Sequence, residues 1–119
     1  MALSDALAVR APEDAYLWAL RAGAEGVPGA IALLDRIEGD LGLAATLRLQ
    51  EAVSGDDQQD PAMLGSVAMI REQAAMRQLG RGMTRSYLIA AKWAMIGAAA
   101  GDAEAADILA DLDEKARRA

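Results

Sequence analysis

Four arginines are the clearest set of side chains in this sequence that could do chemistry. Arg71, Arg77, Arg81 and Arg85 lie on both sides of Gly80. A guanidinium group binds a carboxylate through two parallel hydrogen bonds, so the set could anchor an acidic segment of a partner. Alternatively, Arg77 and Arg81 complement the negative end of the dipole of a preceding helix.

Tyrosines and methionines near the arginines are further candidates for binding. Tyr16 and Tyr87 each lie near a predicted helix start, where the hydroxyl could reach a partner or be buried instead. Met69, Met76 and Met83 recur every seven residues. Such a stripe is either a peptide-binding face or part of the core. Met76 and Tyr87 therefore join the four arginines as candidate partner-binding residues.

The side chains most used in catalysis and metal binding are missing. The chain has no histidine and no cysteine, so the commonest general base, the commonest metal ligand and any thiolate nucleophile are excluded. The acidic stretch GDDQQD, residues 55–60, lacks the glycine and the terminal glutamate of a calcium loop. We therefore expect no catalytic residue, no metal site and no cofactor, and the protein is predicted not to be an enzyme.

Charge and hydropathy limit the classes of partner. The net charge of −6 argues against nucleic acid, because contacts to phosphate need a clustered basic surface. The N-terminal stretch has no positively charged region ahead of an apolar one, so no signal peptide is predicted. The apolar runs are too short to span a bilayer. The expected partner is another protein, and the expected location is the cytoplasm.

The chain is expected to be all-α, with six or seven helices in one domain of 119 residues. Ala and Leu dominate, and no stretch alternates apolar with polar residues over the length of a strand. Pro12, Pro28 and Pro61 suit the first turns of helices, whereas Gly55 and Gly80 suit helix ends. The predicted helices cover about residues 4–10, 12–23, 28–38, 40–53, 61–79, 85–101 and 102–116, with Asp40, Asp60 and Asp102 as N-caps.

Two of these helices have distinctive faces. The helix predicted over residues 61–79 has one apolar stripe of Met63, Val67, Ile70 and Ala74 and a second of Leu64, Ala68, Ala75 and Leu79. A helix that is apolar on two sides is expected to lie between neighbouring helices, as inner helices of α-solenoids do. The last helix has an apolar face of Ala105, Ile108, Leu109, Leu112 and Ala116, and ion pairs Asp111–Lys115 and Glu114–Arg118 are predicted on the other.

The sequence matches itself at an offset of 75 residues. This shift places Trp18 on Trp93 and Gly26 on Gly101. It also pairs Ala15 with Ala90, Ala19 with Ala94, Ala24 with Ala99, Ala30 with Ala105 and Leu34 with Leu109. An offset of 75 is about twice the length of a helical-hairpin repeat. Both tryptophans are therefore predicted to be core residues in matching helices.

The stretch GRGMTRSYLIAAKWAMIGAAAGDAEA resembles the Sel-one-like repeat, a relative of the tetratricopeptide repeat. That repeat consists of a helix, a Gly-x-Gly turn and a helix with spaced alanines, an aromatic residue and a terminal glycine. The matching residues are Gly80 and Gly82 in the turn, then Ala90, Trp93, Ala98, Ala99 and Gly101, with Trp18 and Gly26 in a degenerate first copy. Met83 and Ser86 depart from the family, which usually has valine and often aspartate there. The resemblance divides the chain into repeat regions 12–53 and 61–117.

The resemblance implies both a fold and a class of function. The expected fold is a short right-handed superhelix of antiparallel helical hairpins, similar to tetratricopeptide repeats. The expected function is a non-catalytic scaffold or adaptor that holds a peptide or helix of a partner protein. Two alternatives remain open: a structural module that self-associates or caps a helical-repeat assembly, and a small-molecule-binding or regulatory helical domain.

Overall fold

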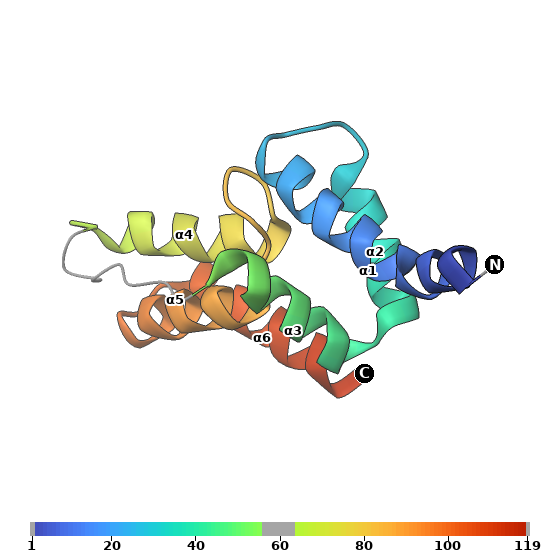
Figure 1. Cartoon of the computed structure of the whole chain (residues 1–119). Helices are drawn as coiled ribbons and strands as arrows, with labels where there is room; N and C mark the ends of the chain where they lie inside the picture. Colours follow the sequence, from blue (N-terminus) through green and yellow to red (C-terminus); the bar gives the residue numbers. More distant parts are fainter. Residues whose placement is uncertain (1, 56–63, 119) are drawn as a thin grey trace.

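A computed structural model describes residues 2–55 and 64–118, with side chains from Pro12 onward (Figure 1). The helices are α1 (Ala2–Ala24), α2 (Ala30–Leu41), α3 (Leu43–Ser54), α4 (Val67–Leu79), α5 (Tyr87–Ala99) and α6 (Ala103–Arg118). No strand occurs within the described ranges. The prediction of an all-α fold is confirmed.

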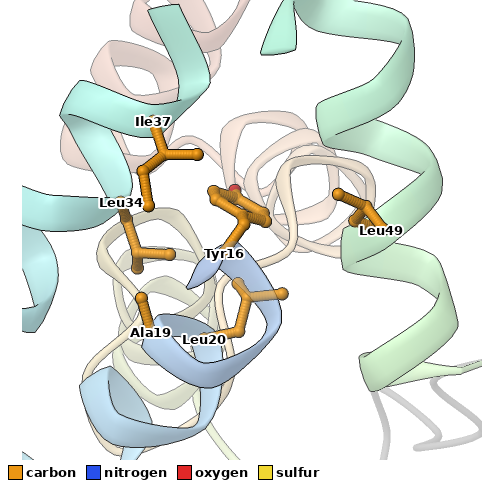
Figure 2. Close-up of a cluster of buried hydrophobic side chains, with 6 residues drawn as sticks. All are labelled: Tyr16, Ala19, Leu20, Leu34, Ile37 and Leu49. Atoms are coloured by element: carbon orange, nitrogen blue, oxygen red, sulfur yellow. The ribbon is translucent and has the colours of Figure 1, made fainter. Parts of the chain in front are cut away.

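The helices form two groups. α1, α2 and α3 pack together, α5 packs against both α4 and α6, and α3 also touches α5. Figure 1 shows α1 and α2 at one end, α4 and α5 at the other, and α3 between them. The first group buries Tyr16, Ala19, Leu20, Leu34, Ile37 and Leu49 (Figure 2), and the second buries Leu64, Ile70, Ala74, Ile89, Trp93 and Ala94.

The pair of α4 and α5 is the antiparallel hairpin predicted for residues 63–79 and 86–100. Ile70 and Ala74 of α4 pack in one cluster with Ile89 and Trp93 of α5. Trp93 is 0% exposed, which confirms it as a core aromatic residue. Figure 1 shows the chain running out along α4 and returning along α5.

The Gly-x-Gly turn between these helices packs tightly against α1. Gly80 and Gly82 have φ angles of 87° and 82°, which side-chain-bearing residues rarely adopt. The amide of Gly82 donates to the carbonyl oxygen of Ala24 at 3.0 Å. A Cβ on Gly23 would lie 2.9 Å from the carbonyl oxygen of Gly80. Both the backbone conformation and the close approach therefore require glycine here.

The hairpins α1–α2 and α5–α6 have the same turn. In each, two backbone hydrogen bonds close the end of the first helix, and their positions differ by 75 residues. The bonds are Gly26 N to Gly23 O (3.0 Å) and Val27 N to Ala22 O (2.9 Å), and Gly101 N to Ala98 O (3.0 Å) and Asp102 N to Gly97 O (3.0 Å). Gly26 and Gly101 both have positive φ. The sequence match at an offset of 75 therefore corresponds to a structural match of these turns.

Two helix boundaries predicted in the first half of the chain are wrong. Pro12 lies inside α1, so residues 4–10 and 12–23 belong to one helix, because strong helix formers on both sides favour continuation. Asp40 lies inside α2 and does not cap α3. Gly42 separates these helices with a φ of 81°, and no side chain caps α3. A glycine with positive φ sets this boundary.

The helix predicted over residues 61–79 begins later, at Val67. Asp60, Pro61 and Met63 lie outside the described residues. Ser66 is the N-cap, and its hydroxyl accepts a hydrogen bond from the amide of Met69 at 3.2 Å. α4 is also not covered on two sides, because Val67, Ala68, Ala75 and Leu79 are exposed. Ile70 and Ala74 form its buried face.

Trp18 is 58% exposed, so its prediction as a core residue is wrong. Tyr16, Ala19 and Leu20 point from α1 into the first core (Figure 2). Each residue turns a helix by about 100°, so Trp18 lies about 200° around α1 from Tyr16 and faces outward. Matching positions in the sequence repeat thus differ in burial.

Candidate functional site

The four arginines do not form one exposed patch. Arg85 is 3% exposed. Its Nη1 lies 2.8 Å from Asp35 Oδ1 and 2.8 Å from Glu38 Oε2, and its Nε donates to the carbonyl oxygen of Leu79 at 3.1 Å. The expectation of a joint surface anchor is therefore corrected, because Arg85 binds groups inside the fold.

The other three arginines have separate surroundings. Arg71 joins α4 to the start of α6, with Nη1 3.2 Å from Asp102 Oδ1 and Nε 3.2 Å from Glu104 Oε2. Arg77, in the last turn of α4, donates to Thr84 O and Thr84 Oγ1 at 3.0 Å. Arg81 is exposed on the turn. The position of Arg77 agrees with the helix-dipole alternative.

The methionines do not share one face. Met69 is 44% exposed on α4, and Met76 is half-buried beside the turn, where its sulfur lies 3.2 Å from the place a Cβ on Gly82 would occupy. Met83 follows the end of α4, because Gly80 stops that helix with an αL conformation. The predicted stripe is therefore broken.

Instead, the structure gathers polar side chains around Glu38. We call Tyr16, Glu38, Gln50, Arg85, Tyr87 and Lys115 the Glu38 cluster; they come from α1, α2, α3, the residue before the cap of α5, α5 itself and α6. Glu38 Oε2 accepts from Tyr16 Oη at 2.6 Å and from Arg85 Nη1 at 2.8 Å. Tyr87 Oη donates to Glu38 Oε1. One carboxylate therefore links both helix groups.

Gln50 and Lys115 complete the cluster. The amide Nε2 of Gln50 donates to Tyr16 Oη at 2.9 Å, and its Oε1 accepts from the backbone amide of Tyr87 at 2.9 Å. Lys115 Nζ lies 3.1 Å from Tyr87 Oη and 3.8 Å from Glu38 Oε1. The predicted pairing of Lys115 with Asp111 is therefore wrong, whereas the pair of Glu114 and Arg118 forms at 2.7 Å.

The environment of the cluster shifts three pKa values. Burial raises the pKa of Tyr16 and Tyr87 far above that of a free tyrosine, and the hydrogen bond and charge of Glu38 act in the same direction. The charge of Arg85 offsets part of this effect at Tyr87. Burial alone would lower the pKa of Arg85, but Tyr87 and Glu38 raise it more, so the guanidinium stays charged. Both tyrosines are neutral hydrogen-bond donors at neutral pH.

An apolar groove lies beside the cluster. It has a volume of about 250 Å³ and runs between α3, α5 and α6. The residues that line what we call the α3/α5/α6 groove are Leu43, Leu47, Tyr87, Leu88, Ala91, Leu109, Leu112, Asp113, Lys115 and Ala116. Leu88 is 47% exposed, and Met95, seven residues further along α5, is 59% exposed. Ala116, predicted to be buried with Leu112, is exposed here.

A second hollow of about 320 Å³ lies on the other side of the cluster. Its lining includes Asp35, Glu38, Thr46, Lys115 and Arg118. Positive and negative side chains alternate around it, and its carboxylates already bind Arg85. This lining favours solvation of an ion-pair network over the uptake of an apolar ligand. The α3/α5/α6 groove is therefore the better docking surface.

Of the residues around Glu38, sequence reasoning found only Tyr16, Tyr87 and Arg85 as candidates, and it missed their common partner. One usable signal was present in α3, where the buried Thr46 and Gln50 share a helical face with Leu49. A polar residue in the apolar phase of a helix indicates a buried hydrogen bond. No such local signal marks Glu38 or Lys115.

The described residues contain no group of three or more acidic side chains that could hold a metal ion. None of the described helices is long and apolar enough to cross a membrane. No family model, no curated protein and no solved structure matches the chain.

Proposed function

We propose that the protein is a non-catalytic interaction module whose α3/α5/α6 groove takes up a helix of a partner protein molecule. The observation that carries this proposal is the apolar surface left open on α5. Its only charged residue is Lys92, and its sequence is apolar almost all the way round. A helix of that composition is normally covered on every side. On α5, however, Leu88 and Met95 are uncovered.

The groove suits a helix better than a small molecule. Its walls are three helices, and its apolar side chains are open to solvent along the outer face of α5. An amphipathic helix presents apolar residues at intervals of three or four, which matches the spacing of Leu88, Ala91 and Met95. Asp113 and Lys115 at the edge would bind polar residues of the partner.

The resemblance of residues 80–101 to Sel-one-like repeats supports the same class of function. Proteins with that repeat are superhelices of hairpins, and they bind other proteins. We include in the proposal a right-handed stacking of the hairpins, a cytoplasmic location, and a role as scaffold or adaptor. The warrant is similarity of a motif, and it names no partner.

A partner exchange experiment tests the proposal. The wild-type chain and the variants Leu88→Arg and Met69→Arg are used to capture proteins from the native cell extract. Met69 is exposed on α4, outside the groove, so it is the matched control. We expect one protein to be retained by the wild type and by Met69→Arg and lost with Leu88→Arg.

The captured protein must then be shown to occupy the groove. A peptide that spans its binding helix should shift the methyl NMR signals of Leu47, Leu88 and Leu112 while leaving those of Val67 unchanged. Binding that is equally strong to Leu88→Arg, or shifts confined to other surfaces, would contradict the proposal. Thermal melting of each variant confirms that it is folded.

A further inference from the structure

The hairpins α1–α2 and α5–α6 are covered on opposite sides. Their turns have equivalent hydrogen bonds at an offset of 75 residues, so residues of α1 and α5 can be compared position by position. On α5, the side that carries Trp93 is covered by Ile70 and Ala74 of α4. The equivalent residue of α1 is Trp18, which is 58% exposed because no described helix covers it.

The other side of each hairpin shows the reverse arrangement. On α1, Tyr16 and Leu20 are covered by Leu49 of α3 (Figure 2). The equivalent positions on α5 are Ala91 and Met95, which border the α3/α5/α6 groove. Met95 is 59% exposed. Each hairpin therefore has one covered side and one open side, and the open sides are opposite.

We propose that a second copy of this chain fills the groove, with the Trp18 surface of one copy docked against Leu88, Ala91 and Met95 of the next. The Trp18 surface consists of Trp18, Val27, Pro28, Leu33 and Arg36, of which Val27 is 38% exposed. This pairing rests on the proposed function, because it uses the same groove. It gives each open side the kind of cover that its counterpart already has within the chain.

The chemistry of the two surfaces fits this pairing. The indole of Trp18 is the largest exposed apolar group on its surface, and tryptophan is the residue type most enriched at the centres of protein interfaces. The groove is apolar and about 250 Å³ in volume. Arg21 and Arg36 flank Trp18, whereas Asp113 stands at the edge of the groove. An arginine beside each indole can therefore meet a carboxylate.

The symmetry of the contact determines the product. The two surfaces are different patches of the same molecule, so the contact is head-to-tail and leaves one open surface at each end. Such a contact extends into chains of increasing length and does not stop at a closed dimer. The mass in solution should therefore rise continuously with protein concentration.

Two variants that each block one surface provide the test. Trp18→Glu destroys the Trp18 surface and keeps the groove, and Met95→Glu does the opposite. Sedimentation velocity is measured for each alone, for an equimolar mixture, and for the wild type from micromolar to millimolar concentration. We expect chains for the wild type, monomers for each variant alone, and dimers without larger species for the mixture. Met69→Glu, on α4, should assemble as the wild type does.

Each contrary result has a defined meaning. A wild type that stays monomeric at millimolar concentration overturns the self-association, and the proposed function then still stands if a foreign helix binds in a Leu88-dependent way. Assembly that persists in Met95→Glu shows that the groove is not the docking surface, which overturns both. A mixture that yields no dimer overturns the head-to-tail pairing. Melting temperatures like that of the wild type exclude unfolding of the variants.

Discussion

Replacing Arg85 by alanine should strongly destabilise the protein. Arg85 is 3% exposed and binds Asp35 and Glu38 at 2.8 Å each. The substitution leaves the carboxylate of Glu38, whose side chain is 11% exposed, without its closest cation. Removing one partner of a buried ion pair costs about 3–5 kcal/mol. Tyr16, Tyr87 and Lys115 still contact Glu38, so we expect a loss of about 3 kcal/mol, at the lower end of that range.

Urea unfolding followed by circular dichroism measures this loss. A decrease of about 3 kcal/mol in a chain of this length also lowers the melting temperature by about 10 °C. Arg81→Ala is the matched control: Arg81 is exposed four residues earlier, and its removal should change stability by less than about 0.5 kcal/mol.

A second variant separates the lost ion pair from a simple loss of packing. If the uncompensated charge of Glu38 causes the loss, then Glu38→Gln in the Arg85→Ala background should recover about 1–2 kcal/mol. Equal stability of Arg85→Ala and Arg81→Ala would refute the assignment of Arg85 as the link between the helix groups. A double variant weaker than Arg85→Ala would refute the role of the charge.

Three further predictions concern packing and pH. Trp93→Ala should cost about 3–5 kcal/mol in urea unfolding, whereas Trp18→Ala, at the equivalent repeat position but exposed, should cost about 1 kcal/mol or less; equal losses would contradict the difference in burial. Gly97→Ala should cost about 1–3 kcal/mol, because its Cβ would lie 2.7 Å from a side-chain atom of α6, whereas Gly39→Ala, inside α2 with open space around it, should stabilise by about 0.5–1 kcal/mol. Burial raises the pKa of Tyr16 in the folded state, so the free energy of unfolding should be constant just below pH 10 and fall above it, by about 1 kcal/mol per buried tyrosine between pH 10 and 11. Tyr16→Phe should remove that part of the fall, and an identical alkaline profile in the variant would contradict the burial of its hydroxyl.

The features that were predicted correctly all depend on neighbours in the chain. Gly55 and Gly80 end α3 and α4 because a glycine with positive φ stops a helix regardless of what surrounds it. The hairpin of α4 and α5 follows from a short turn between two apolar faces. Ser66 shows the limit of this reasoning. It caps α4 in place of Asp60, and both residue types are good caps, so composition alone did not distinguish them.

The Glu38 cluster depends on residues far apart in the chain. Tyr16 and Glu38 are 22 positions apart, and Arg85 and Glu38 are 47 apart. Each of these residues has an ordinary alternative on a solvated helix face, so nothing local indicates that they meet. Arg85 was therefore interpreted as a surface anchor, whereas the packing of α2 against the turn before α5 buries it.

The sequence by itself determined the helical class of this protein, its glycine turns and the repeat that relates its two hairpins, because those features follow from local backbone preferences and from the period of apolar residues. Only the tertiary structure decided which repeated residue is buried. Trp18 and Trp93 occupy equivalent positions in equivalent helices, yet one is 58% exposed and the other 0%. The physical reason is that burial depends on the neighbouring helix, and α4 covers α5 while no described helix covers that side of α1.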